Sequence, residues 1–347
     1  MKIALDAMGG DFAPGNPVAG AIDALSEFPQ IEELILVGDE PRIRMELSKL
    51  GVSKTPDRIS INHCSEVIEM CEPAVAAVRK KKDSSINRTI ELVKEGRALA
   101  AVSAGNTGAM TACSSLRLRT LPGVPKAGIA ALMPTETNVF VLLDVGANVD
   151  ARAEHLTIYG IMGSIYSKST LGFTKPRVGL LSVGTEDAKG NDLTKEAFKM
   201  LRSAPVNFIG NIEGRDLYEN PVEVVVTDGF TGNVVLKTSE SIAHSIFSWL
   251  KHELNSTPTR LFGAWLARKA FAAIKKKTNY EEYGGSLLLG LNGTVVIAHG
   301  SSTPLAMKNA IRVAAQAIEK NINHQIIEQV SQFKEHNKKG LSLAWKK

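Results

Sequence analysis

Cysteines are scarce in this chain of 347 residues, and their scarcity excludes several kinds of protein. Only three occur, Cys64, Cys71 and Cys113, and no two of them have CxxC spacing. An odd number of irregularly spaced cysteines supplies neither a disulfide framework nor a four-ligand zinc site. The sequence is therefore typical of a protein that stays in a reduced, cytoplasmic setting.

Long hydrophobic runs are also missing. Asp6 interrupts the first apolar stretch after three residues, so we expect no signal peptide. The longest stretch without Asp, Glu, Lys or Arg, 283–307, contains Asn292, His299 and Pro304. Lipid would leave such polar groups without hydrogen-bond partners, so we expect no transmembrane helix.

Several motifs that identify well-known enzymes are absent. The sequence has no Gly-Lys dipeptide, no GxGxxG, no GxSxG and no HExxH. These absences argue against a P-loop nucleotide site, a standard dinucleotide turn, a hydrolase nucleophile elbow and a zinc protease site. We expect neither a cofactor nor a metal.

The composition is that of a folded globular protein, with 44% hydrophobic and 22% charged residues. A net charge of +5 is too weak by itself to indicate nucleic-acid binding. The length allows two domains or one large domain with two lobes. We expect one domain over residues 1–330 with two interwoven lobes, followed by a polar, basic tail over 331–347.

Short β-branched runs alternate with longer stretches of helical periodicity. Strands are predicted at residues 2–5, 33–37, 58–62, 98–102, 139–143, 178–182, 206–209, 222–226 and 294–298. Helices are predicted at residues 17–26, 73–81, 107–118, 153–167, 192–202, 231–254 and 304–321. This alternation predicts an α/β fold with a mostly parallel sheet between helices. In such a sheet the carboxyl ends of the strands share one edge, where ligands bind.

Five of the predicted strands are followed by loops that combine glycine with hydroxyl or amide side chains. The loops are 103–108, 144–148, 183–187, 227–233 and 299–303. Most lead into a predicted helix, whose N-terminus offers N–H groups and partial positive charge to an anion. Together they predict a site for an oxyanion such as phosphate. The alternative is that each loop is only a helix cap with a turn glycine.

Eight segments of the sequence occur in the order found in one known family. They are LDAMGGD (5–11), RKKKDSS (79–85), SAGNTGA (103–109), DVGAN (144–148), SVGTED (182–187), DGFTGNVVLK (228–237), YGG (283–285) and HGSS (299–302). With them the chain resembles the phosphate acyltransferases of bacterial phospholipid synthesis, the PlsX family, from residue 1 to about 317. The resemblance implies a three-layer α/β/α sandwich like that of isocitrate and isopropylmalate dehydrogenases. It also implies a homodimer.

The implied reaction transfers a fatty acyl group from acyl-(acyl carrier protein) to inorganic phosphate. The acyl phosphate then passes to a membrane glycerol-3-phosphate acyltransferase for phospholipid synthesis. The implied location is the cytoplasm, with peripheral contact to the inner face of the cell membrane. Phosphate is already an anionic nucleophile, so the enzyme needs no covalent intermediate.

The candidate site residues come from the glycine-containing loops. We expect phosphate and the acyl group to be bound by Asn106, Thr107, Gly108, Thr185, Thr231, Gly232, Ser301 and Ser302. The catalytic candidates are Asn233, Lys237 and His299. Lys237 follows Asn233 by four residues and so shares its helix face, where it can offer charge to phosphate or to the leaving thiolate. His299 is a candidate general acid or oxyanion donor. The alternatives are an ion-paired or surface lysine and a structural histidine.

Two basic segments are candidate contact surfaces. The run Arg79, Lys80, Lys81 and Lys82 predicts a docking patch for the acidic acyl carrier protein, or else a solvated helix end. Residues 259–277 carry six basic residues and no acidic one. With Phe262, Trp265 and Leu266 they predict a basic amphipathic membrane-contact helix within 255–280. The alternative is a helix packed on the partner subunit.

Three other functions remain open from the sequence. A phosphotransacetylase that uses an acyl-coenzyme A would share the phosphate loops, since DGFTGN also resembles the matching segment of those enzymes. A nicotinamide-dependent decarboxylating dehydrogenase of similar fold would need clustered acidic metal ligands, which we do not find. A basic membrane- or nucleic-acid-binding module would not need polar loops after so many strands.

Overall fold

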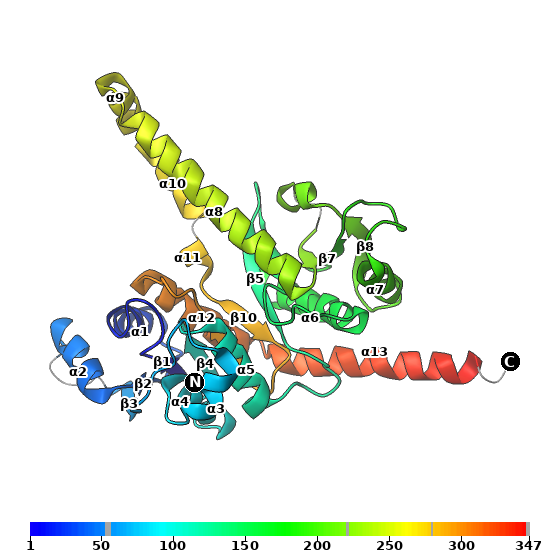
Figure 1. Ribbon diagram of the computed structural model, residues 1–347, viewed down its shortest axis with the longest axis horizontal. Helices are drawn as coiled ribbons and strands as arrows, with labels where there is room; N and C mark the ends of the chain where they lie inside the picture. The colour runs from blue at the N-terminus through cyan, green and yellow to red at the C-terminus, as the bar shows by residue number, and fades with distance from the viewer. Residues whose placement is uncertain (53–56, 220–221, 279, 345–347) are drawn as a thin grey trace.

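A computed structural model of the chain describes residues 1–52, 57–219, 222–278 and 280–344, with side chains described through residue 336 except at 278 and 280. Within these residues the backbone forms an eleven-stranded sheet of order β3-β2-β1-β4-β11-β10-β5-β6-β9-β7-β8. Helices cover both faces of the sheet (Figure 1). The α/β fold with a mostly parallel sheet is therefore confirmed.

The predicted strands are all present, with ends that differ by a few residues. They are β1 (Lys2–Asp6), β2 (Glu33–Gly38), β3 (Ile59–His63), β4 (Ala100–Ser103), β6 (Val139–Leu143), β7 (Arg177–Leu181), β8 (Asn207–Ile212), β9 (Val224–Val226) and β11 (Thr294–Ile297). The sequence does not predict β5 (Gly128–Pro134) or β10 (Ser286–Leu289). Apart from Ile129, these two strands contain only Gly, Ala, Leu, Met, Pro and Ser, so they lack a run of β-branched residues.

The two missed strands reverse the direction of the sheet. Strands β1, β2, β3, β4 and β11 run parallel to one another, and β6, β7, β8 and β9 form a second parallel set. Between the sets, β10 and β5 pair antiparallel with each other and with their outer neighbours. The expectation that all carboxyl ends share one edge is therefore wrong, because the two sets point in opposite directions.

The register nevertheless brings the carboxyl ends of the two sets together. Ile297 at the end of β11 pairs with Ser286, and Leu143 at the end of β6 pairs with Ala130. Leu287 pairs with the same Ala130, so both strand ends reach nearly the same level on the β10–β5 pair. The loops after β4 and β11 thus face the loops after β6 and β9 across the middle of the sheet.

The helices follow the strands in the expected alternation. Those that the sequence predicts are α1 (Gly15–Glu27), α3 (Ala74–Lys80), α5 (Thr107–Leu118), α6 (Ala153–Leu171), α7 (Asp192–Arg202), α8 (Gly229–Leu254) and α12 (Pro304–Glu319). The structure adds α2 (Glu40–Lys49), α4 (Ser85–Lys94), the short η1 (Gly214–Tyr218) and α11 (Tyr280–Tyr283). Asp39, Ser84, Asn106, Asn191, Asp228 and Thr303 cap their helices through side-chain oxygens.

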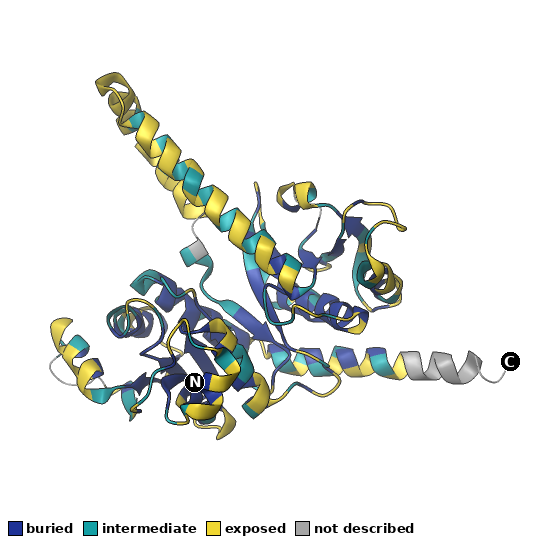
Figure 2. Ribbon diagram, in the orientation of Figure 1, coloured by how far each residue is buried: buried dark blue, intermediate teal, exposed yellow. Residues whose placement is uncertain are grey.

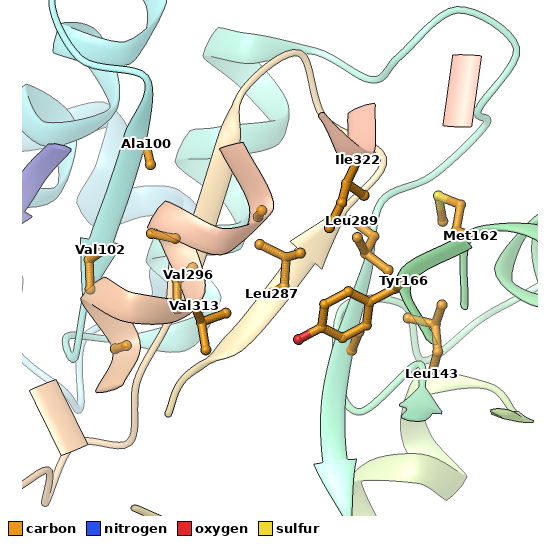
Figure 3. Packing of buried hydrophobic residues seen from close by; sticks show 14 of the residues in the cluster. Ala100, Val102, Leu143, Met162, Tyr166, Leu287, Leu289, Val296, Val313 and Ile322 are labelled. Atoms are coloured by element: carbon orange, nitrogen blue, oxygen red, sulfur yellow. The ribbon is translucent and has the colours of Figure 1, made fainter. Parts of the chain in front are cut away.

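Two buried clusters fill the space on the two faces of the sheet. Ile3 and Leu5 of β1 point into the cluster under α1, α12, α6 and α13, whereas Ala4 between them points into the cluster under α4 and α5. At the middle of the sheet, Leu287 and Leu289 of β10 lie among side chains from both halves (Figure 3). Each cluster contains residues of both strand sets, so packing on both faces joins the two halves of the sheet.

The predicted membrane-contact helix is two helices. α9 (Pro258–Leu266) ends at a cap on Ala267, and α10 (Arg268–Thr278) begins directly after it. The break interrupts the single amphipathic helix that the sequence predicts within residues 255–280. Together with α8 these helices form an arm that projects from the body and is mostly exposed (Figures 1 and 2). Among the described residues, no helix combines the length and apolarity needed to cross a bilayer.

The predicted polar tail differs from the structure in its first part. α13 (Ile322–Ala344) continues through residue 331 as a helix, and residues 345–347 lie outside the described residues. Val330 and Phe333 are buried, because this helix packs against α6. A periodic apolar face inside a basic segment accounts for the helix.

Candidate active site

A pocket of ≈ 190 Å³ lies where the two sets of strand ends face each other. Its polar lining comes from distant parts of the chain, with Thr107 after β4, Asn233 and Lys237 on α8, and His299 after β11. The apolar walls come from β5, the loop after β6, α8 and β11. Their residues are Ile129, Ala131, Leu132, Val145, Leu236, Ile297 and Ala298. The structure thus brings together four of the residues that the sequence predicts for the site.

The start of α8 is fixed by close packing against the loop after β6. A Cβ added at Gly232 would lie 1.9 Å from the carbonyl oxygen of Asp144, so only glycine fits there. One residue further on, the Asn233 Nδ2 lies 3.1 Å from the place a Cβ of Gly146 would occupy. Gly146 has φ +138°, a conformation that side chains rarely adopt. Glycines on both loops therefore let the Asn233 amide reach the pocket.

Asp144 organises this loop from inside the protein. Its buried carboxylate accepts hydrogen bonds from the backbone N–H groups of Ile129, Gly146, Ala147 and Asn148 at 2.7–3.1 Å. Burial raises the pKa of the carboxyl, and the four N–H donors oppose that rise. The residue holds the loop against β5 and has no need to contact a ligand.

The backbone N–H groups at the start of α8 are already occupied. The Asp228 carboxylate accepts from the N–H groups of Phe230 and Thr231, and also from the Thr231 hydroxyl at 2.8 Å. The N–H of Gly229 donates to Asn148, and that of Gly232 donates to the Asp228 carbonyl. Thr231 and Gly232 therefore build the helix start, and α8 offers side chains to the pocket instead of backbone groups.

At the start of α5, too, some predicted residues are occupied within the protein and another reaches the pocket. The Asn106 Oδ1 caps the N–H of Ala109, and its Nδ2 donates to the carbonyls of Glu69, Met70 and Glu72 at 3.1–3.2 Å. This amide is buried and fully used within the protein. Thr107 is exposed and lines the pocket, and Gly108 beside it is exposed. Of the three predicted residues, Thr107 is the one with a side chain at the pocket.

The hydrogen bonds of His299 fix its tautomer. Its Nδ1 accepts from the backbone N–H of Ser301 at 3.3 Å, with the Ser301 hydroxyl at 2.8 Å from the same nitrogen. A nitrogen that accepts from a backbone N–H carries no proton, so the neutral ring has its proton on Nε2. The Ser302 hydroxyl donates to the His299 carbonyl at 2.6 Å and so stabilises the turn.

Lys237 and Glu240 form an ion pair inside the pocket wall. The Lys237 Nζ lies 2.9 Å from the Glu240 Oε2, and the Glu240 side chain is only 25% exposed. Glu240 was not among the predicted site residues, because nothing in the sequence showed that this turn of α8 faces the pocket. Tyr283 also lines the pocket, and its hydroxyl donates to the Lys277 carbonyl at the end of α10.

The charges around His299 favour its neutral form. Partial burial and the nearby Lys237 ammonium lower its pKa below the usual 6.5, whereas Glu240 and Asp11 act in the opposite direction. At neutral pH the ring is therefore an uncharged Nε2–H donor, suited to a developing oxyanion. This setting favours the oxyanion-donor role over the general-acid role for His299.

This electrostatic setting predicts the pH dependence of activity. Protonation of Nδ1 at acidic pH would break its bond from the Ser301 N–H, so kcat/KM should fall as the pH drops below the lowered imidazole pKa, in addition to the fall that protonation of phosphate causes. The measurement is a pH profile of kcat/KM for the wild type and His299→Gln. The variant should lose this acidic limb and keep only the limb that phosphate ionisation contributes. An unchanged profile in the variant would contradict the assignment.

Other predicted residues lie outside the pocket lining. Thr185 is exposed on the loop after β7, two strands away from β6 in the sheet. Arg79, Lys80 and Lys82 are exposed at the end of α3. Lys81 differs from them, because its Nζ pairs with Glu72 at 2.6 Å and donates to the Val67 carbonyl. Phe262, Trp265 and Leu266 are exposed on α9, in the projecting arm.

Comparisons with known proteins agree on one kind of chemistry. The family described as "fatty acid synthesis protein" matches residues 1–325. A phosphate acyltransferase from Akkermansia muciniphila is 46% identical over 339 residues, which cover 96% of this chain and 97% of that protein. A phosphate acyltransferase from Pelotomaculum thermopropionicum is 47% identical over 326 residues, 94% of each chain.

Solved structures show a likeness in fold. A phosphotransacetylase from Streptococcus pyogenes is 20% identical with a TM-score of 0.58, covering 92% of this chain and 94% of that one. The EutD phosphotransacetylase from Staphylococcus aureus is 16% identical with a TM-score of 0.55, covering 91% and 93%. At these identities the likeness shows a shared arrangement of strands and helices.

Proposed function

The chain belongs to the fatty acid synthesis protein family of phosphate acyltransferases, and from this we propose that it transfers a fatty acyl group from acyl-(acyl carrier protein) to inorganic phosphate. The product is an acyl phosphate, which serves phospholipid synthesis. The observation that carries the proposal is the pocket itself. Amide, hydroxyl, ammonium and imidazole donors from three separate segments converge there beside an apolar wall.

In the proposed mechanism a phosphate oxygen attacks the thioester carbonyl carbon directly. The new C–O bond forms first and gives a tetrahedral oxyanion. The C–S bond then breaks, so that the thiolate leaves and the acyl group stays on the phosphate. Thr107 and the Asn233 amide hold the phosphate, and the Lys237 ammonium balances its charge. The Nε2–H of His299 donates to the carbonyl oxygen as it becomes an oxyanion. Orientation of the two reactants can supply up to about 7–11 kcal/mol of such a barrier.

The proposed function is tested by trapping its product. Purified protein is incubated with palmitoyl-(acyl carrier protein), with and without inorganic phosphate, and acyl phosphate is captured by hydroxylamine under conditions that spare the thioester. Hydroxamate that forms only with phosphate is the expected result. If folded protein gives none, the same assay with palmitoyl-coenzyme A tests the phosphotransacetylase alternative. Product from neither donor would overturn phosphate acyl transfer altogether.

We propose that the exposed end of α3 docks the carrier protein. Arg79, Lys80 and Lys82 offer three unburied positive charges, and α3 packs against α5, whose first residue lines the pocket. Lys80→Glu should raise KM for the acyl carrier substrate about tenfold and weaken its salt dependence, with KM for phosphate unchanged. Lys199→Glu on α7 is the matched charge control. Equal effects of both variants would refute this docking site.

We propose that the tip of the arm contacts the membrane. Leu261, Phe262, Trp265 and Leu266 are each more than half exposed on α9, where the rings of Phe262 and Trp265 stack at 5.9 Å. Arg268 lies 4.8 Å over the Trp265 ring, so cations flank the apolar tip. Trp265→Glu should abolish sedimentation with vesicles of anionic lipid. Retained sedimentation, or a change in oligomeric state instead, would favour packing of α9 on a partner subunit.

A further inference from the structure

The pocket is too small for the whole of a long acyl donor. Its volume of ≈ 190 Å³ is below the roughly 300–1,000 Å³ that encloses a drug-sized ligand. Phosphate and the thioester carbonyl must already occupy the part lined by Thr107, Asn233, Lys237 and His299. A chain of many methylene groups must therefore continue outside the pocket, over surface that is apolar and close to these residues.

Met70 offers an apolar surface close to His299. The Met70 Cε lies 2.8 Å from the place a Cβ of Gly300 would occupy, so this side chain covers the residue next to His299. The Asn106 amide holds the Met70 carbonyl at 3.1 Å and so fixes this segment to the start of α5. Met70 is nevertheless 46% exposed. A flexible thioether in this position adapts well to an alkyl chain.

Phe230 on α8 offers a second apolar surface. On α8, residues 230, 233 and 237 are spaced by three and four, so Phe230 shares a helix face with Asn233 and Lys237, which line the pocket. Phe230 is 64% exposed although it begins a helix that is capped and packed against the loop after β6. A large aromatic side chain left open beside donors for phosphate is suited to an apolar part of the same ligand.

We propose that the acyl chain of the donor leaves the pocket across Met70 and Phe230, and that these two side chains give the enzyme its preference for long chains. The inference rests on the proposed function and names the part of the substrate that the pocket does not hold. Each buried methylene group changes affinity by about fourfold, so contact with several groups at one side chain is measurable. Short acyl donors end inside the pocket and gain nothing from either residue.

The test compares two donors in the same variants. Met70→Ser and Phe230→Ser should each lower the ratio of kcat/KM for palmitoyl- over butyryl-(acyl carrier protein) about tenfold. Met45→Ser on α2 is the matched control, because Met45 is a methionine of similar exposure, 52%, on another surface. Its ratio should equal that of the wild type. An unchanged ratio in the Met70 and Phe230 variants would overturn the inference.

Two further readouts separate this inference from the function on which it rests. Binding of the fluorescent 18-carbon fatty acid cis-parinaric acid needs no reaction, and it should weaken in Met70→Ser and Phe230→Ser but not in Met45→Ser. Weakened binding without acyl phosphate from the wild type would leave the chain-binding surface standing and refute the function. A change in oligomeric state of either variant would show that a second copy covers this face, and would overturn the inference.

Discussion

Replacing Asn233 by alanine should lower kcat for acyl phosphate formation by about 10²–10³-fold, the usual cost of one preorganised donor at a charged reacting group. The Asn233 side chain is exposed in the pocket and lies against Gly146. Among the described residues its amide has no hydrogen-bond partner, so the side chain is poised for a ligand and contributes little to folding. Stability should therefore stay within about 0.5 kcal/mol of the wild type.

The control for Asn233→Ala is Thr238→Ala, an exposed position on another face of α8. It should leave both kcat and the free energy of unfolding unchanged, which separates loss of the amide from a general effect on the helix. Single-turnover measurements at saturating phosphate would then show whether the loss lies in the chemical step. An Asn233→Ala enzyme with normal turnover would remove Asn233 from the mechanism.

Replacing Gly232 by alanine should damage both the fold and the activity. The added Cβ would meet the Asp144 carbonyl oxygen at 1.9 Å, and that oxygen belongs to a loop pinned by four hydrogen bonds. The start of α8 must therefore move away, at a cost of about 1–3 kcal/mol in the free energy of unfolding. Asn233 and Lys237 move with it, and a displacement of about 1 Å can cost about 10²-fold in turnover.

Gly263→Ala on α9 is the matched control for this substitution. A Cβ at Gly263 would have nothing within 4 Å, and the residue lies inside a helix. Alanine there should be neutral or stabilise by up to about 1 kcal/mol. Chemical denaturation and kcat for the two variants give the comparison. Equal stability and activity of Gly232→Ala and Gly263→Ala would contradict the packing described for α8.

The parallel parts of the fold were predictable because their strands are buried on both faces. Continuous Val, Ile and Leu runs such as those of β6 and β9 give a clear signal. β5 and β10 gave none, since Ala and Leu are common in helices and Gly and Pro are common in turns. Because β5 and β10 were not predicted, the sequence did not show that the sheet reverses direction. It therefore did not show why two sets of loops face each other.

The site was predictable only as a set of loops. A glycine lies next to Thr107, Asn233 and His299, and such glycines mark places where a ligand can approach the chain. This signal depends only on neighbouring residues, so the sequence shows it. The sequence could not separate Thr107 from Asn106, because the Asn106 amide is occupied by carbonyls of residues 69–72, far away in the chain. Nor could it show Glu240 beside Lys237 in the pocket wall.

The sequence by itself determined which strands of the two parallel sets form, which loops carry polar donors after glycine, and which family the motifs resemble. Those properties depend on residues within a few positions of each other. Tertiary structure alone decided which donors remain available, as Thr231 is bound to Asp228 and the first N–H groups of α8 are all occupied. It also decided that residues 107, 233 and 299 meet at one pocket, because register between strands is fixed by packing across the whole core.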